Sequence, residues 1–317
     1  MIRIATLGTS TITRLFIEAA VDVPTVAVTT AYSRDAERAA QFAGETGLSS
    51  STCDLDRLLS SAEIDAVYIA SPNGVHARQA RQVIDAGKHV LIEKPAVPTV
   101  GEFVDLISAA TNAGVVVLEA MRNRYDPALT AIADLLPELG VLRRASLSYC
   151  QRSARYDKVL AGERVNIFDP ALAGGSLLDL GVYPIAAMIH LFGEPDRVVG
   201  AGIPITGGAD GAGAALAVYD GMVVDLSYSK ITASDRVDEI QGESGTLTFD
   251  HVAEPGLARL RLLDGSVTDH SFAGPRNNMV HEIRRFASLV EGTADVATDH
   301  AETVATLRVV EQLRTAG

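Results

Sequence analysis

The stretch KHVLIEKP, residues 88–95, decides the fold. Its apolar centre is typical of a buried parallel strand, and that strand ends at Glu93-Lys94-Pro95. Ligands of open α/β sheets bind outside the carboxyl ends of the strands. A lysine at this position can contact both a cofactor and a substrate. Partial burial can lower the pKa of a lysine towards the range that acid–base chemistry needs. An isolated lysine in a loop would be a solvated charge, so the interpretation depends on the neighbouring segments.

Those neighbouring segments alternate between short apolar runs and Ala-rich helical patterns. We expect strands over residues 2–7, 25–31, 65–70 and 115–118 in addition to this one, with helices over 13–21, 36–46, 76–86 and 99–113. Alternation of this kind predicts a doubly wound parallel sheet, the Rossmann type of α/β fold. We assign residues 1–121 to this domain and expect it to bind a dinucleotide.

Composition limits the possible functions. The chain has 317 residues, enough for two domains, and with 47% apolar but only 5% aromatic residues its cores must be aliphatic. No apolar run approaches the about 20 residues of a membrane span. The net charge of −13 argues against nucleic acid as a partner, and the two cysteines are too few for a disulfide framework or a zinc site. We expect a cytoplasmic protein with no membrane partner and no metal site.

The turn after the first strand reads Gly8-Thr9-Ser10-Thr11-Ile12-Thr13. Gly8 matches the first glycine of a dinucleotide-binding loop, whereas Ser10 and Thr13 replace the second and third. Small hydroxyl residues still allow a pyrophosphate to approach, so we take Gly8, Thr9, Ser10 and Ile12 as cofactor-binding candidates. A purely structural turn remains the alternative.

The second strand ends at Ser33-Arg34-Asp35, where NAD-preferring sites place an acidic residue. A hydroxyl followed by a guanidinium suits a 2′-phosphate, because arginine binds phosphate with two parallel hydrogen bonds. Ser33 and Arg34 therefore favour NADP(H), with NAD(H) left open, and Asp35 is expected to cap the next helix.

The third strand is followed by the turn Ser71-Pro72-Asn73-Gly74 and then by His76. We expect Asn73 to cap the next helix and His76 to lie in its first turn. Taken alone, His76 is typical of a structural histidine.

The pattern changes after residue 121, where long β-rich segments replace the alternation. Expected strands span residues 142–151, 197–205, 213–219, 222–230, 235–241, 246–249 and 258–263, with helices over 127–136, 175–192, 278–291 and 300–314. Successive strands without intervening helices predict an α+β domain with an open, mostly antiparallel sheet. We assign residues 122–317 to this second domain.

The helix beginning at Gly174-Gly175 carries Asp179 and Tyr183 on an otherwise apolar surface. Residues four apart share one face of a helix, so the two polar groups make either a mutual contact or the wall of a cavity. Asp179, Tyr183 and Lys94 form a set suited to moving a hydroxyl proton during hydride transfer.

Three stretches resemble the glucose–fructose oxidoreductase, inositol dehydrogenase and MocA family (Gfo/Idh/MocA). They are Ser71-Pro72-Asn73 with His76, the run from Ala86 to Glu93-Lys94-Pro95, and the segment from Gly174-Gly175 to Tyr183-Pro184. The resemblance implies that Lys94 is the catalytic proton donor or acceptor, that Asp179 and Tyr183 assist it, and that Glu93 and Pro95 shape its turn. It also implies cofactor contacts from Ser71, Pro72, Asn73, His76 and Glu93, and homodimers or homotetramers formed through the second-domain sheet.

The function implied by the resemblance is hydride transfer between NAD(P) and a secondary alcohol or carbonyl of a sugar, polyol or cyclic diol. Many inositol-type relatives have histidine where this chain has Tyr183, which favours the sugar and dihydrodiol dehydrogenase types. The alternative is a nucleotide-binding sensor that keeps the fold and lacks the chemistry. Cofactor-assisted glycoside hydrolysis is a third reading, without an identifiable pair of opposed carboxylates to support it.

Overall fold

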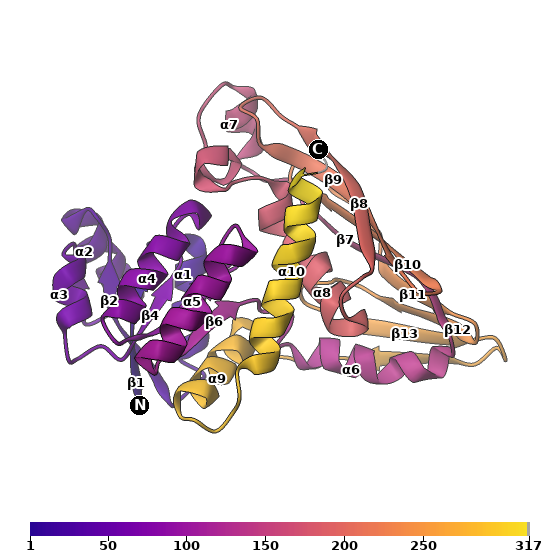
Figure 1. Ribbon diagram of the computed structural model, residues 1–317, viewed down its shortest axis with the longest axis horizontal. Helices are drawn as coiled ribbons and strands as arrows, with labels where there is room; N and C mark the ends of the chain where they lie inside the picture. The colour runs from indigo at the N-terminus through magenta and orange to yellow at the C-terminus, as the bar shows by residue number, and fades with distance from the viewer. Residues whose placement is uncertain (316–317) are drawn as a thin grey trace. The chain divides into compact units, whose positions relative to one another are not determined.

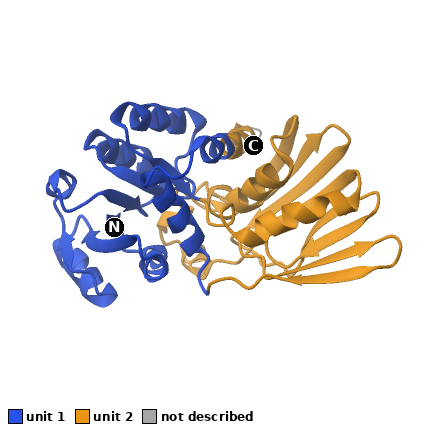
Figure 2. Cartoon of the chain, turned by 90° about the horizontal axis from the view of Figure 1, so that it is seen from below, with its two compact units in different colours: residues 1–120, 276–304 blue, residues 121–275, 305–317 orange. Residues whose placement is uncertain are grey.

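The structure is a computed structural model that describes residues 1–315. It divides into two compact units, shown in different colours in Figure 2. Unit 1 contains Met1–Ala120 and Arg276–Val304, and unit 2 contains Met121–Pro275 and Ala305–Gly317. The chain thus passes between the units after Ala120, after Pro275 and after Val304, so a late segment returns to the first unit.

Unit 1 is built on a six-stranded parallel sheet, which confirms the predicted Rossmann fold (Figure 1). In the order β3-β2-β1-β4-β5-β6, its strands are β1 (Ile2–Leu7), β2 (Val26–Tyr32), β3 (Ser50–Thr52), β4 (Ala66–Ile69), β5 (His89–Glu93) and β6 (Val117–Ala120). Its helices are α1 (Thr11–Ala20), α2 (Ala36–Thr46), α3 (Leu55–Ser60), α4 (His76–Asp85), α5 (Val100–Ala113), α9 (Met279–Val290) and the start of α10 (Ala297–Thr315). The strand order changes direction between β1 and β4, which is where such sheets bind their ligands.

Aliphatic side chains on its central strands explain why this sheet is buried between helices. All four residues of β4 are buried, and so are Val90, Leu91 and Ile92 of β5, as expected for strands covered by helices on both faces. The Phe16 ring in α1 stacks on the Tyr68 ring in β4, with ring centroids 3.7 Å apart. This stack fixes α1 over the strand beside the nucleotide loop.

The segment that returns to unit 1 brings α9 against α1 and β6. Val280, Ile283 and Phe286 lie fully buried on one side of α9, and Asn277 Nδ2 donates a hydrogen bond to Leu15 O at 2.8 Å. Amphipathic spacing marks α9 as a helix in the sequence, but it does not say which sheet the apolar side will cover.

Unit 2 contains an eight-stranded sheet in the order β14-β13-β12-β11-β7-β10-β9-β8. Its strands are β7 (Leu142–Cys150), β8 (Arg197–Pro204), β9 (Asp210–Tyr219), β10 (Met222–Ser229), β11 (Asp238–Gly242), β12 (Gly245–Phe249), β13 (Leu257–Leu262) and β14 (Val267–Ser271). Apart from the parallel pair β7 and β10, neighbouring strands are antiparallel, which confirms the predicted sheet. Helices α6 (Pro127–Leu135), α8 (Val182–Phe192) and the second part of α10 pack on one face (Figure 1). The remaining described elements of this unit are α7 (Tyr156–Leu160), the 3₁₀ turns Leu136–Leu139, Asn166–Phe168 and Pro170–Leu172, and the π-helical turn η5 (Leu177–Gly181).

The expectation that no apolar run approaches the length of a membrane span is wrong for one segment of unit 2. Within residues 1–315, Pro170–Phe192 is long and apolar enough by composition, but 83% of its most apolar window is buried inside the structure. It is apolar because it forms the centre of the unit 2 core, where Ile185, Ala187 and Met188 are fully buried.

Asp238 at the start of β11 makes the stability of unit 2 depend on pH. Its carboxylate is buried and accepts a hydrogen bond from Ser148 N at 2.6 Å, yet burial dominates and raises its pKa to about 7. The folded state therefore holds this proton more tightly than the unfolded state does. As a result, stability is lost as the pH rises from about 4 to about 7.

We expect Asp238→Asn to remove this dependence, because the amide oxygen still accepts from Ser148 and carries no charge. Between pH 5 and pH 7 the wild type should lose about 2 kcal/mol relative to the variant. Urea unfolding at several pH values measures the difference, with Asp235→Asn at an exposed position as the control. Parallel pH profiles for wild type and Asp238→Asn would contradict the expectation.

Candidate active site

The turn between β1 and α1 requires glycine at its first position. Gly8 has φ +128°, and a Cβ built there would lie 2.5 Å from Ala70 O at the end of β4. Ser10 and Thr13 face each other across the first turn of α1, with their hydroxyl oxygens 3.2 Å apart. The residues that replace the usual second and third glycines therefore contact each other at the start of α1. The free backbone amides at the start of a helix favour the binding of an anion.

Two arginines follow β2: Arg34 lies in the loop after the strand, and Arg38 lies in the first turn of α2. Asp35 Oδ1 accepts from Arg38 N at 3.0 Å, which confirms that Asp35 caps α2, and Ser33 Oγ accepts from Asp35 N at 3.3 Å. Arg34 is exposed, and Arg38 Nε donates to Thr9 Oγ1 at 2.7 Å. Arg38 was not among the candidates, because in the sequence it resembles an ordinary exposed residue of the helix after β2.

His76 joins two loops at the carboxyl edge of the sheet. The ring is fully buried, with Nε2 2.7 Å from Ser71 O and Nδ1 3.1 Å from Pro95 O. Burial lowers the pKa of the His76 ring, and the adjacent carbonyl groups oppose this shift. His76 thus links the backbone of the loop after β4 to the backbone of the loop after β5. Nearby, Ser71 Oγ donates to Gln79 Oε1 at 2.5 Å. The expectation that Asn73 caps the next helix is wrong, because Asn73 begins the 3₁₀ turn Asn73–Val75 and Val75 is the N-cap residue of α4.

The turn that carries Lys94 is anchored on its amino-terminal side by Glu93. Tyr68 OH donates to Glu93 Oε1 at 2.5 Å, and Lys94 N donates to Glu93 Oε2 at 3.2 Å. The Lys94–Pro95 peptide bond is cis, and the Lys94 side chain is half-buried.

Glu119 anchors the other side of the same turn. Its Oε1 accepts from Ala96 N at 3.0 Å, and its Oε2 accepts from Thr303 Oγ1 at 3.0 Å. The backbone on both sides of Lys94 is therefore fixed by buried carboxylates. The geometry presents one lysine, on a turn held from both sides, at the edge of the sheet where ligands bind.

The Gly-Gly pair of unit 2 makes room for a carboxylate that sequence reasoning missed. Gly175 has φ +136°, and a Cβ there would lie 2.0 Å from Asp210 Oδ1. Asp210 Oδ2 accepts from Leu177 N at 2.6 Å, so it caps the helical segment that carries Asp179. Burial raises the pKa of Asp210, opposed by these backbone hydrogen bonds.

Asp179 and Tyr183 have different neighbours in unit 2. Asp179 lies in the π-helical turn η5 and forms an ion pair with Lys230. Tyr183 lies in α8, with its ring 5.3 Å from that of Tyr149 and 5.6 Å from the Arg122 guanidinium. A π-helical turn inside a helix is often found at a functional site.

Around Tyr183 the structure adds groups that the sequence did not single out as a cluster. Arg122 forms an ion pair with Glu254, and Tyr149 meets His251 edge to face at 4.8 Å. Burial lowers the pKa of His251. The chemistry of this cluster suits a hydroxylated ligand, because phenol, imidazole and guanidinium groups supply hydrogen bonds around an aromatic wall.

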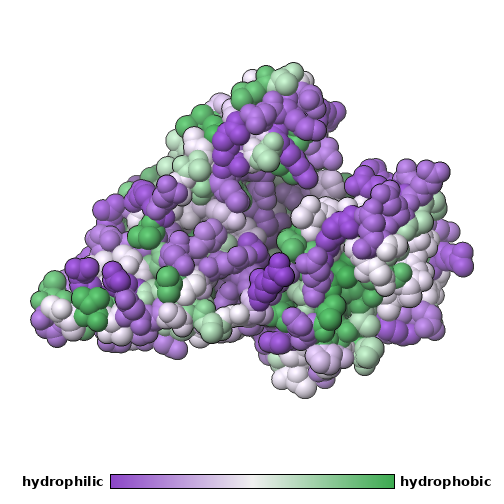
Figure 3. Space-filling view, turned by 180° about the vertical axis from the view of Figure 1, so that it is seen from behind, coloured by the Kyte–Doolittle hydropathy of each residue, from purple (hydrophilic) through white to green (hydrophobic). Residues whose placement is uncertain are grey.

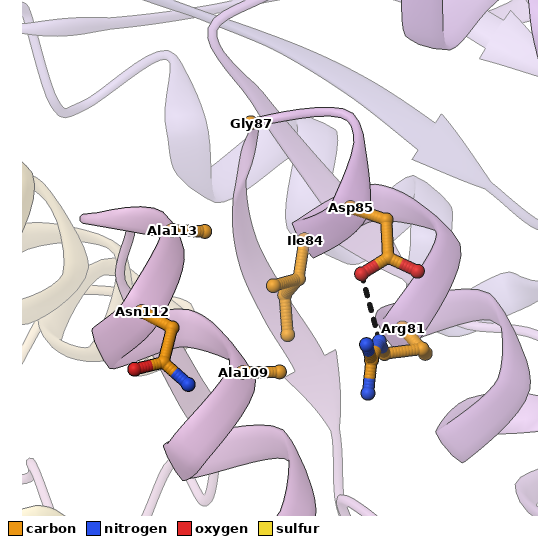
Figure 4. Close-up of a pocket in the computed structure, with 7 residues that line it drawn as sticks. All are labelled: Arg81, Ile84, Asp85, Gly87, Ala109, Asn112 and Ala113. Atoms are coloured by element: carbon orange, nitrogen blue, oxygen red, sulfur yellow. Dashed lines mark hydrogen bonds and ion pairs between the residues drawn. The ribbon is translucent and has the colours of Figure 1, made fainter.

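A cavity of about 320 Å³ in unit 1 is lined by none of the candidate site residues of that unit (Figure 4). Arg81, Asp85 and Gly87 line it at the end of α4, together with Asn112 and Ala113 at the end of α5. These helix ends lead into the beginnings of β5 and β6, at the edge of the sheet opposite Lys94. The Arg81–Asp85 ion pair on the wall of the cavity is a contact within one helix (Figure 4). Figure 3 shows one face of the whole molecule, on which both hydrophilic and hydrophobic residues are exposed.

Comparison with known proteins agrees with this geometry. The description "Oxidoreductase family, NAD-binding Rossmann fold" matches residues 2–121, and "GFO/IDH/MocA C-terminal domain" matches residues 137–248. The chain is 38% identical to the scyllo-inositol 2-dehydrogenase (NADP(+)) of Bacillus subtilis, over 99% of this chain and 96% of that protein. It is 30% identical to D-xylose 1-dehydrogenase (NADP(+)) 2 of Haloferax volcanii, over 89% and 86% of the two chains.

Among solved structures, a 3-ketoreductase from Actinomadura kijaniata in complex with NADP and TDP-benzene superposes with a TM-score of 0.88. The two chains are 24% identical and the match covers 99% of this chain and 97% of that one, so it supports the fold of both units. The resemblance predicted from the three sequence stretches is confirmed. The chain belongs to the Gfo/Idh/MocA family and is an NAD(P)-dependent oxidoreductase.

Proposed function

We propose that this protein interconverts a secondary alcohol and a carbonyl of a sugar, polyol or cyclic diol, with NADP(H) as its cofactor and Lys94 as its proton-transfer group. The observation that carries the proposal is the turn Glu93-Lys94-Pro95, held by Tyr68 and Glu119 at the carboxyl end of β5. An ammonium on a fixed turn gives a proton to a developing alkoxide, and the neutral amine takes it back in the oxidative direction.

The cofactor fits the residues at the β1 and β2 ends. The absent side chain of Gly8 leaves room for a pyrophosphate beside Thr9, Ser10 and Ile12, and the guanidinium groups of Arg34 and Arg38 suit a 2′-phosphate. When bound, the nicotinamide supplies or accepts the hydride. Ser71, Pro72 and Asn73 belong to the segment after β4 and His76 begins α4, and we assign all four residues to the same binding site.

The preference for NADP(H) is tested at the two arginines. We expect Arg34→Ala and Arg38→Ala each to weaken NADP⁺ binding about 10-fold or more, since each removes a charge-assisted hydrogen bond to phosphate. NAD⁺ binding should change far less, because NAD⁺ lacks the 2′-phosphate. Fluorescence titration of both nucleotides measures this, with the exposed Arg57→Ala as the matched control. Equal losses for both nucleotides would remove Arg34 and Arg38 from 2′-phosphate recognition.

We assign the substrate hydroxyls to Asp179 and Tyr183, with Lys94 moving the proton. The Bacillus relative is named for scyllo-inositol and the Haloferax relative for D-xylose, so inositols stay among the proposed substrates despite Tyr183. Purified protein with NADP⁺ and a panel of aldoses, inositols and cyclic diols, followed by nicotinamide absorbance, tests the proposal. Turnover that Lys94→Met abolishes supports it, and turnover that survives this change rules out the assigned role of Lys94.

We also propose a cytoplasmic homodimer or homotetramer assembled through the open face of the unit 2 sheet. Val199 and Leu216 are register partners on β8 and β9, and they remain 45% and 39% exposed, with Ile203 at 59% farther along β8. A row of exposed apolar side chains on a sheet is an expected interaction surface.

Leu216→Arg should therefore dissociate the oligomer, because it places a charge in the middle of that row. Size-exclusion chromatography with light scattering measures the mass of the wild type and the variant. Leu160→Arg on α7, at a position that is 65% exposed, is the control. A wild type that is monomeric at all concentrations would contradict the proposal.

A further inference from the structure

Lys230 is a buried cation that lies behind the proposed catalytic carboxylate of unit 2. It follows β10 directly, and its backbone is fixed on both sides: its N donates to Gly211 O at 2.8 Å, and its O accepts from Ser153 N at 2.8 Å. Its ammonium forms the ion pair with Asp179. The side chain therefore starts from a rigid strand end and reaches the π-helical turn η5.

The two partners differ strongly in exposure. The Lys230 side chain is 3% exposed and that of Asp179 is 37% exposed, so the carboxylate is the accessible member of the pair. The Phe168 ring lies 5.0 Å from the ammonium and shields it with an aromatic face. A buried ammonium is costly unless it is paired with an anion, so this arrangement stabilises Asp179 in its charged form.

The elements packed against η5 bring further titratable groups to its vicinity. The main elements that pack on η5 are β7, β9, β10 and α8. They bring Tyr149, Asp210, Tyr228 and Tyr183 to its vicinity, in addition to Lys230. The charge of Lys230 also acts to lower the pKa of Asp210, so the lysine stabilises the charged form of two carboxylates near the start of the same helical segment.

We propose that Lys230 is a positioning residue for the reaction: it holds Asp179 ionised and oriented so that Asp179 can accept a hydrogen bond from the substrate hydroxyl. The proposal deepens the proposed function and rests on the assignment of Asp179 to the substrate. Lys230 itself does not need to touch the substrate, because Asp179 is the exposed partner. A carboxylate that is held by an ion pair on one side is better preorganised to orient the substrate hydroxyl, whose carbon gives up the hydride.

The first test is the pH profile of kcat/KM for Lys230→Met, which keeps the length of the side chain and removes its charge. A neighbouring cation lowers a carboxylic pKa by about 1–3 units, so its loss should move the acid limb upward by about that much. Lys230→Arg keeps the charge and should restore the limb, whereas NADPH binding should be unchanged in both variants. Lys158→Met, at an exposed position on α7, is the matched control.

The second test is thermal unfolding, which does not require turnover. Asp179→Asn leaves the buried ammonium without its carboxylate and should lower Tm, and adding Lys230→Met should restore much of that loss without restoring activity. Additive Tm changes for the two substitutions, or an unshifted acid limb in folded Lys230→Met, would overturn the proposal. If the wild type oxidised no substrate of the panel, the proposed function would fail while non-additive Tm changes still established the coupled pair.

Discussion

Lys94→Met is expected to lower kcat about 10²–10⁴-fold, the usual contribution of a general acid–base group. This corresponds to about 3–5 kcal/mol of lost transition-state stabilisation. Methionine keeps the length of the side chain and its apolar stem, while the Glu93 and Glu119 contacts to the backbone of the turn remain. The variant should therefore fold and bind NADPH, and it should fail at the proton transfer.

Stopped-flow and steady-state nicotinamide absorbance measure this effect in both directions of the reaction. Lys88→Met is the matched control, because Lys88 precedes the same strand at its other end and donates to Ser61 O at 2.9 Å. A turnover number near that of the wild type in Lys94→Met, with the correct substrate, would exclude Lys94 as the proton-transfer group.

Gly8→Ala is expected to have a large structural effect although it adds only a single methyl group. The added Cβ would meet Ala70 O at 2.5 Å and Ala70 C at 2.8 Å, and the residue would keep a φ of +128° that suits only glycine. Strain and overpacking together should cost about 2–5 kcal/mol of unfolding free energy. Because the clash separates the ends of β1 and β4, we also expect the loss of most NADPH affinity.

Urea unfolding and fluorescence titration of NADPH measure the two consequences of Gly8→Ala. Gly101→Ala is the control: it lies in α5 with no heavy atom within 4 Å of the added Cβ, and alanine there should stabilise by up to about 1 kcal/mol. A Gly8→Ala protein with wild-type stability and affinity would show that the turn opens without cost.

The predictable part of this fold follows from local pattern. The β1, β2, β4 and β5 runs are apolar and lie between helical stretches, and the long strands β7 to β10 lie between clear turns, so both sheets follow from the sequence. β3 was missed because three residues are too few to show a period, and β14 because Val267–Ser271 is mostly exposed and polar. The parallel pair of β7 and β10 depends on a long crossover that no local signal marks.

The candidate site was predictable only where it is local in sequence. Lys94, Asp179 and Tyr183 lie in recognisable stretches, whereas their supports come from far along the chain. Glu119 holds the Lys94 turn from another strand, and Lys230 reaches Asp179 across 51 positions. Buried polar partners of this kind are fixed by tertiary packing, and they resemble ordinary strand or loop residues in a single sequence.

Helix α10 limits how this protein can be divided or recombined. Thr303 in its first half supports Glu119 in unit 1, while Val309, Val310 and Leu313 in its second half belong to the core of unit 2. A fragment that ended at residue 121 would expose the apolar surface that α9 covers on β6, and it would leave Glu119 without Thr303. The Rossmann unit is therefore not a portable module of this chain: an exchange of nucleotide-binding halves between relatives has to carry α9 and the start of α10 with it.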